Sequence, residues 1–423
     1  MAHRGPAEPA AAESEIHVLV VGAGLTGVLA AARLRARADA AGRPLRLTVW
    51  ERATYPSGRF GATAAHGAAV ADLGSQVLST VDPRDERAQP GHGISTGAAR
   101  AAWALRGDLV ARGLLTPAPD EALGAVEERL NWPRLWHHAH APRGLGAVLR
   151  ALLEDARPDA VRFGLRVDGV AATHAGGTAW GVQRHGDGAS TPLRESFDSV
   201  ILAVPAPDAA RVANVAASLP PASAAILHGV GYDRRVATAI FYENGDGLIG
   251  SRLAALCGAR GATELDFDDA DEARHGIHLI AWQGAKGPRD AARGVVVAHS
   301  VASGHGRDDD LRAAVTPRAV HDALERAGIG LTADALAERT LATRTIDWRV
   351  AQMIRPAESL VGAPSFAPPV LAATGGDDKR PWLLLAGDFL SQSSFLGCVA
   401  SAHAAADAAL GLGNEPQRDT ASV

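Results

Sequence analysis

The first fifty residues of the sequence combine two apolar runs with a helical pattern between them. Ile16–Val21 is an apolar run interrupted only by His17, and such runs indicate a strand buried on both faces of a parallel sheet. Residues 28–37 have apolar positions spaced for one face of a helix, and Leu45–Trp50 is a second apolar run. The pattern predicts a strand–helix–strand unit with parallel strands.

Beyond this unit the pattern is less regular, and it predicts elements of several kinds. They are strands at 196–205 and 382–386, a helix at 397–410, antiparallel strands within 230–245 and 276–301, helices at 320–327 and 333–341, and surface excursions or hairpin tips at 82–93 and 172–192. Rossmann-like elements therefore stand at both ends of the chain and near residue 200, and sheet-rich material lies between them.

The turn after the first strand contains Gly22, Gly24 and Gly27 in the spacing GxGxxG. In a dinucleotide-binding turn the first glycine permits the sharp bend and the second lets the backbone approach a pyrophosphate. The third allows close packing of helix on strand, and the free N–H groups of the helix face the anion. Here the motif follows a predicted strand and opens a predicted helix, so it predicts a dinucleotide site rather than a simple glycine turn.

Glu51 ends the second predicted strand, at about the spacing from Gly27 that such folds use for an acidic residue. A carboxylate there accepts hydrogen bonds from the ribose hydroxyls of the adenosine half and repels a 2′-phosphate. An exposed glutamate beside Arg52 is the structural alternative. Up to this point FAD and NAD fit the sequence equally well.

The C-terminal segment favours FAD. The predicted strand 382–386 leads into Gly387-Asp388, and a helix follows. In FAD enzymes of the two-dinucleotide-domain type, an acid at this place holds the ribityl or pyrophosphate region. The N-terminus of the next helix stabilises negative charge on the reduced flavin ring.

These elements predict an α/β fold, with a discontinuous Rossmann-type FAD-binding domain and an inserted substrate domain of antiparallel sheet plus helices. The predicted boundaries are 16–80, 141–210 and 376–412 for the FAD-binding domain, 81–140 and 211–375 for the substrate domain, and 1–15 and 413–423 for disordered tails.

Composition narrows the setting. The 423 residues carry a net charge of −5 without a basic stripe or basic amphipathic face, so we expect neither nucleic-acid nor membrane binding. Cys257 and Cys398 are the two cysteines, too few for a disulfide framework. The first fifteen residues lack the apolar run of a signal peptide, and we expect a cytoplasmic protein.

Several blocks along the chain resemble, in order, the renalase family of FAD-dependent amine oxidases. The blocks are Val18–Gly27, Val49–Glu51, Ser57–Arg59, Ala71–Gln76, His140–Leu145, Val200–Pro207, Ala239–Glu243, Ala386–Asp388 and Gln392–Ala402. The family usually has Gly-Gly-Arg where this chain has Ser57-Gly58-Arg59, and Ser57 loses backbone freedom only if its position needs a positive φ. The chain also has extra material around 82–95, 172–192 and 285–310.

The motifs and the resemblance together imply a set of cofactor-binding residues. They are Gly22, Ala23, Gly24, Leu25, Thr26, Gly27, Glu51, Arg52, Arg59, Gly74, Ser75, Gln76, Val167, Gly387, Asp388, Ser394 and Phe395. FAD is expected to be noncovalent, because renalases carry a cysteine matching Cys398 and hold FAD without a bond. His137, His138 and His140 lack metal-ligand spacing, so no metal site is predicted.

The resemblance implies oxidation of the 2- and 6-dihydro isomers of NAD(P) to NAD(P)+, with oxygen reduced to hydrogen peroxide. The flavin is the reacting centre, so no catalytic side chain is predicted. One alternative is a flavin amine oxidase acting on a small amine, which would usually need a lysine near the flavin. Lys286 is the only central lysine. A non-catalytic FAD-binding protein is the other alternative.

Overall fold

The structure is a computed structural model. It describes residues 14–85, 94–118, 136–186, 188–258, 264–266, 276–286, 294–302, 308–355, 370–374 and 380–412. The predicted disordered tails lie outside these ranges except for Ser14 and Glu15, and so does most of the predicted excursion at 82–93.

A six-stranded sheet contains the strand–helix–strand unit predicted from the sequence. β1 (Ile16–Val21) and β2 (Leu45–Trp50) pair in parallel, and α1 (Leu25–Ala41) connects them. The strand order is β20 (Leu371–Thr374), β21 (Pro381–Leu385), β12 (Ser199–Leu202), β1, β2 and β8 (Ala160–Arg162). Only β20 is antiparallel to its neighbour.

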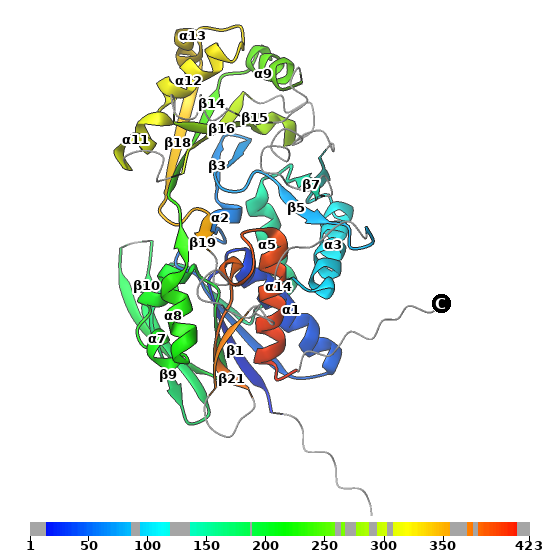
Figure 1. Ribbon diagram of the computed structural model, residues 1–423, viewed down its shortest axis with the longest axis vertical. Coiled ribbons are helices and arrows are strands. Elements are labelled where there is room, and N and C mark those ends of the chain that lie inside the picture. Colours follow the sequence, from blue (N-terminus) through cyan, green and yellow to red (C-terminus); the bar gives the residue numbers. More distant parts are fainter. Residues whose placement is uncertain are drawn as a thin grey trace, which may run out of the picture.

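The two faces of this sheet are buried by different elements, as Figure 1 shows. Val18 and Val20 pack with the helices α1, α3 (Thr96–Ala111), α5 (Leu145–Ala156) and α14 (Phe395–Ala409). Leu19 and Val21, which point the opposite way, pack with β9 (Leu165–Thr173), β10 (Gly176–Arg184), β11 (Ser190–Phe197), α6 (Ala206–Arg211), α7 (Val215–Ser218) and α8 (Pro221–Gly229). Burial on both faces explains why the strands are mostly apolar.

Two sequence predictions are wrong in this region. The single strand expected at 196–205 is divided between β11 and β12, because Asp198 exchanges hydrogen bonds with the backbone of His17 and the chain passes there from one sheet to the next. The stretch 172–192 is mostly strand: β9, β10 and β11 form an antiparallel sheet, and only its turns are excursions.

A second, five-stranded antiparallel sheet has the order β15 (Glu264–Asp266), β16 (Ile277–Trp282), β17 (Val295–Ser300), β14 (Arg235–Tyr242) and β18 (Thr340–Trp348). One face packs against α9 (Leu248–Gly258), α11 (Asp308–Ala314), α12 (Pro317–Arg326) and α13 (Ala333–Glu338). The other face meets the hairpin of β3 (Thr63–His66) and β4 (Ala69–Asp72). This hairpin places residues near Asp72 against the antiparallel sheet.

The remaining described elements are short. They are α2 (Gly58–Gly61), β5 (Leu78–Val81), β6 (Thr116–Pro117), β7 (Trp136–His140), β13 (Gly231–Tyr232), β19 (Met353–Arg355), η1 (Gln283–Lys286) and η4 (Asp388–Leu390). The mixed α/β architecture agrees with the fold class predicted from the sequence. The substrate-binding role of the antiparallel sheet and the domain boundaries stay predictions.

Candidate functional site

The three glycines of the GxGxxG turn are glycine for different reasons. Gly22 has φ +101°, and a side chain on it would lie 2.6 Å from the carbonyl oxygen of Ala203. A side chain on Gly27 would lie 1.8 Å from the carbonyl oxygen of Gly22. At Gly24 the nearest protein atom to an added Cβ is the carbonyl oxygen of Ser57, 3.9 Å away, which is ordinary contact distance. The protein's own packing therefore explains Gly22 and Gly27, but not Gly24.

Gly24 is the N-cap of α1, so the first N–H groups of the helix open beside it. Ala23 and the first-turn residues Leu25 and Thr26 are buried, and Ala23 and Leu25 belong to the hydrophobic core. A dinucleotide pyrophosphate fits this turn: it needs close backbone approach where Gly24 lacks a side chain, and it is anionic where the helix is positive.

Glu51 lies at the end of β2, as predicted, and its side chain is held by the glycine turn. Its carboxylate accepts hydrogen bonds from the N–H of Ala23 at 2.6 Å and the N–H of Ala53 at 2.8 Å. The Leu165 N–H donates to the carbonyl of Glu51, which brings the start of β9 and the predicted residue Val167 near this end of the site. Arg52 instead has an exposed side chain that pairs with Asp208.

Arg59 and Asp388 are far apart in sequence and form a bidentate ion pair. The two terminal nitrogens of Arg59 donate to the two carboxylate oxygens of Asp388 at 2.9 and 2.7 Å. Ser393 also donates to Asp388, and the ring of Tyr232 lies under the guanidinium at 5.4 Å. Burial disfavours the guanidinium charge, but the Asp388 carboxylate outweighs burial and raises the pKa of Arg59. Two residues that were predicted to bind the cofactor are thus bound to each other.

The Ser57 departure from the family pattern is explained by the backbone. Ser57 has φ −150°, whereas Gly58 has φ +77°. The position that needs glycine is therefore still glycine. A Cβ on Gly58 would lie 3.5 Å from the Cα of Gly24, so α2 lies directly against the glycine turn.

The helix that follows Asp388 starts at Phe395, two residues earlier than predicted, with Ser394 as its N-cap. The Ser394 hydroxyl accepts the N–H of Gly397, and the Phe395 side chain is buried in the core. These two predicted residues position the helix N-terminus. Burial, with the nearby Asp388 carboxylate, raises the pKa of Cys398 to about 12.

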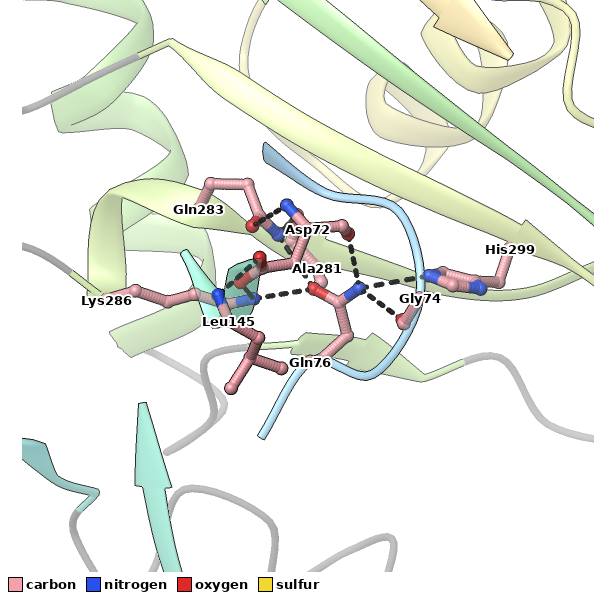
Figure 2. A network of polar contacts seen from close by, with 8 residues as sticks. All are labelled: Asp72, Gly74, Gln76, Leu145, Ala281, Gln283, Lys286 and His299. Carbon is pink, nitrogen blue, oxygen red and sulfur yellow. Dashed lines mark hydrogen bonds and ion pairs between the residues drawn. The ribbon is translucent and has the colours of Figure 1, made fainter. Parts of the chain in front are cut away.

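The loop after β4 is fixed from two sides. Against α2, the Ser75 N–H donates to the carbonyl of Arg59, and a side chain on Gly74 would lie 1.8 Å from that oxygen. Against the antiparallel sheet, the Gln76 side chain is buried in a polar network (Figure 2). The members of that network are Asp72, Gly74, Gln76, Leu145, Ala281, Gln283, Lys286 and His299.

Sequence reasoning missed Asp72, Gln283 and His299, and left the place of Lys286 open. Asp72 lies inside a block that resembles the family, which is a usable signal. Gln283 and His299 lie outside the blocks that resemble the family, and only the structure brings them to Gln76.

The histidines of β7 do not form a metal site. His138 lies 2.8 Å from the Ser79 hydroxyl, and the His137 ring packs edge-on against Trp103. Across the residues that the structure describes, no three His, Cys, Asp or Glu side chains are placed to hold a metal ion. The same residues contain no helix with the length and apolar character needed to span a bilayer.

Comparison with known proteins agrees with this geometry. A protein-family model described as an NAD(P)-binding Rossmann-like domain matches residues 20–89. Mouse (Mus musculus) renalase is 30% identical over 236 residues, which cover 54% of this chain and 58% of the mouse protein. The crystal structure of a "Putative protoporphyrinogen oxidase" from Exiguobacterium sp. 255-15 aligns over 95% of this chain and 99% of its own, with a TM-score of 0.52 and 15% identity.

The last of these similarities shows a shared fold, and the renalase match spans little more than half of each protein. The Rossmann-like match covers the glycine turn and Glu51, so it shows a dinucleotide-binding fold in this part of the chain.

Proposed function

We propose that this chain is an FAD-dependent oxidase that resembles renalase. Its proposed substrates are the 2- and 6-dihydro isomers of NAD(P), which are oxidised to NAD(P)+ while oxygen is reduced to hydrogen peroxide. The observation that supports cofactor binding is the space beside Gly24, where the nearest protein atom to an added Cβ is 3.9 Å away. The similarity to mouse renalase supports the substrate class.

Different residues of the site would bind different parts of FAD. The N-terminus of α1 would meet the pyrophosphate, and Glu51, oriented by Ala23 and Ala53, would accept the ribose hydroxyls. The Arg59–Asp388 pair would lie at the pyrophosphate and ribityl region. When bound, FAD would supply the hydride acceptor and pass two electrons to oxygen. The substrate leaves as an aromatic cation, so the protein needs no general base.

Anaerobic mixing with candidate substrates tests this proposal. We expect 2- or 6-dihydro-NAD to reduce the flavin fast, NADH much more slowly, and simple amines not at all. The hydride leaves from a different ring carbon in each isomer, and only a matching pocket holds that carbon within about 3–3.5 Å of the flavin. The measurement is the loss of flavin absorbance after mixing. An amine that outruns every dihydronicotinamide isomer would overturn the substrate assignment.

The amine oxidase alternative has one structural observation in its favour. Lys286 donates a hydrogen bond to Gln76, which belongs to the loop predicted to contact the cofactor. Its ammonium is already bound to Asp72 and Gln76, however, so the lysine has a role that does not require an amine substrate. The amine arm of the same mixing experiment distinguishes the two functions.

The flavin should be held without a covalent bond. The raised pKa of Cys398 keeps its thiol protonated at neutral pH, and the thiolate is the nucleophilic form. We therefore expect acid or heat to release free FAD from the purified yellow protein, as measured by absorbance of the supernatant. Flavin that stays with the denatured chain would contradict this and implicate Cys398.

A further inference from the structure

The ion pair between Lys286 and Asp72 is buried to an unusual degree for two charged groups. The ammonium nitrogen lies 3.1 Å from the carboxylate, and the two side chains are 6% and 1% exposed. Moving both charges out of water costs free energy that an apolar pair would not. The pair also fixes the geometry of its neighbours.

The neighbour that the ammonium orients is Gln76. Nζ of Lys286 donates to Oε1 of Gln76 at 2.8 Å, and Gln283 donates to the same oxygen. The amide nitrogen of Gln76 must then point the other way, where it donates to the carbonyls of Asp72 and Gly74 at 2.7 and 3.0 Å. Those two bonds close the loop around the Gln76 side chain.

We infer that Lys286 is a positioning residue for the cofactor loop, Leu73–Gln76. From η1, beside the antiparallel sheet, its ammonium holds the loop through Asp72 and Gln76 (Figure 2). The opposite side of the loop is bonded to the backbone of Arg59. The inference rests on the proposed function, in which this loop contacts FAD, and it extends that function by linking FAD binding to the docking of the second sheet.

The two histidines that face the pair, His299 and His140, cannot replace the positive charge of Lys286 if that residue is substituted. Burial, aided by charges that include Lys286, lowers the pKa of His299 on β17 to about 3 and that of His140 on β7 to about 4. Both rings are therefore neutral above about pH 6. Beside its pairing with Thr63 in the β3–β4 hairpin, Asp72 contacts the N–H of Leu145 at the start of α5, and the Gln76 and Gln283 amides.

The test compares Lys286→Met with the double variant Lys286→Met/Asp72→Asn, and uses Arg112→Met, which breaks an exposed ion pair, as the matched control. FAD affinity of the apoprotein is measured by fluorescence titration, and folding by circular dichroism. Without the ammonium, the Asp72 carboxylate is a buried group that has lost its charged partner. Lys286→Met should therefore lose FAD affinity roughly tenfold or more.

The double variant has no buried charge to compensate, so it should regain most of the affinity, and the control should bind FAD as tightly as the unaltered protein does. If both lysine variants fail to fold, Gln76→Met takes their place, since it keeps the ion pair but removes the oriented amide. Affinity equal to that of the unaltered protein, in Lys286→Met or in this substitute, would overturn the inference.

Two further outcomes are distinguishable. Slower flavin reduction with unchanged FAD affinity would mean that Lys286 acts on the reaction and not on the loop, which overturns the inference alone. An unaltered protein that does not bind FAD would overturn the proposed function, and the inference with it.

Discussion

The Gly24→Val variant is expected to fold and to load no FAD. The added side chain points into space where Ser57 O, 3.9 Å from the Cβ position, is the nearest protein atom. The backbone of Gly24, with φ −76° and ψ −177°, is also one that valine adopts without strain. The variant should therefore keep its stability, while the branched side chain fills the volume that the pyrophosphate needs.

The measurement is the ratio of flavin to protein absorbance after purification, and again after incubation with excess FAD. Gly107→Val is the matched control, because Gly107 also has open space around it but lies on α3, far along the chain from the glycine turn. The control should be as yellow as the unaltered protein. A fully yellow Gly24→Val protein would mean that the motif is only a structural turn.

The elements that the sequence predicted well are those whose burial is visible in a short stretch of consecutive residues. Apart from His17 and Arg46, β1 and β2 are buried on both faces, so their sequences are mostly apolar and their bounds match the predicted runs. The Ser57 question was likewise local, since it depended on one φ angle. Patterns of this kind need no knowledge of what lies across the fold.

Contacts between distant segments explain what the sequence did not predict. The break between β11 and β12 depends on Asp198 bonding to His17 in another strand, which no apolar run signals. Arg59 and Asp388 were each predicted to meet the cofactor, but their pairing with each other is visible only once α2 and η4 are placed. The ion pair of Lys286 on η1 with Asp72 on β4 is likewise visible only in the structure.

Breaking the pair of Arg59 and Asp388 should have the second-largest effect. In Arg59→Met the Asp388 carboxylate stays buried, with a side chain only 6% exposed, and it loses both guanidinium bonds. Removing one partner of a buried pair leaves an uncompensated charge. Arg59 is itself 27% exposed, so the expected loss of folding stability is near the lower end of that effect, about 3 kcal/mol.

The double variant Arg59→Met/Asp388→Asn separates stability from cofactor binding. Without an unpaired charge it should recover most of the unfolding free energy, measured by urea denaturation of the apoprotein. It should still bind FAD weakly, because both predicted contacts to the pyrophosphate and ribityl region are gone. Arg84→Met, which breaks the exposed pair with Asp82, is the control and should change neither quantity measurably.

FAD titrations of the same four proteins decide between two roles for this pair. If the ion pair only stabilises the fold, the double variant will bind FAD as tightly as the unaltered protein once it is folded. If the pair also forms part of the site, the FAD affinity of the double variant will stay low while its folding stability returns. The geometry favours the second outcome, because the backbone of Arg59 contacts the cofactor loop and its neighbour Gly58 lies 3.5 Å, measured from an added Cβ, from the Cα of Gly24.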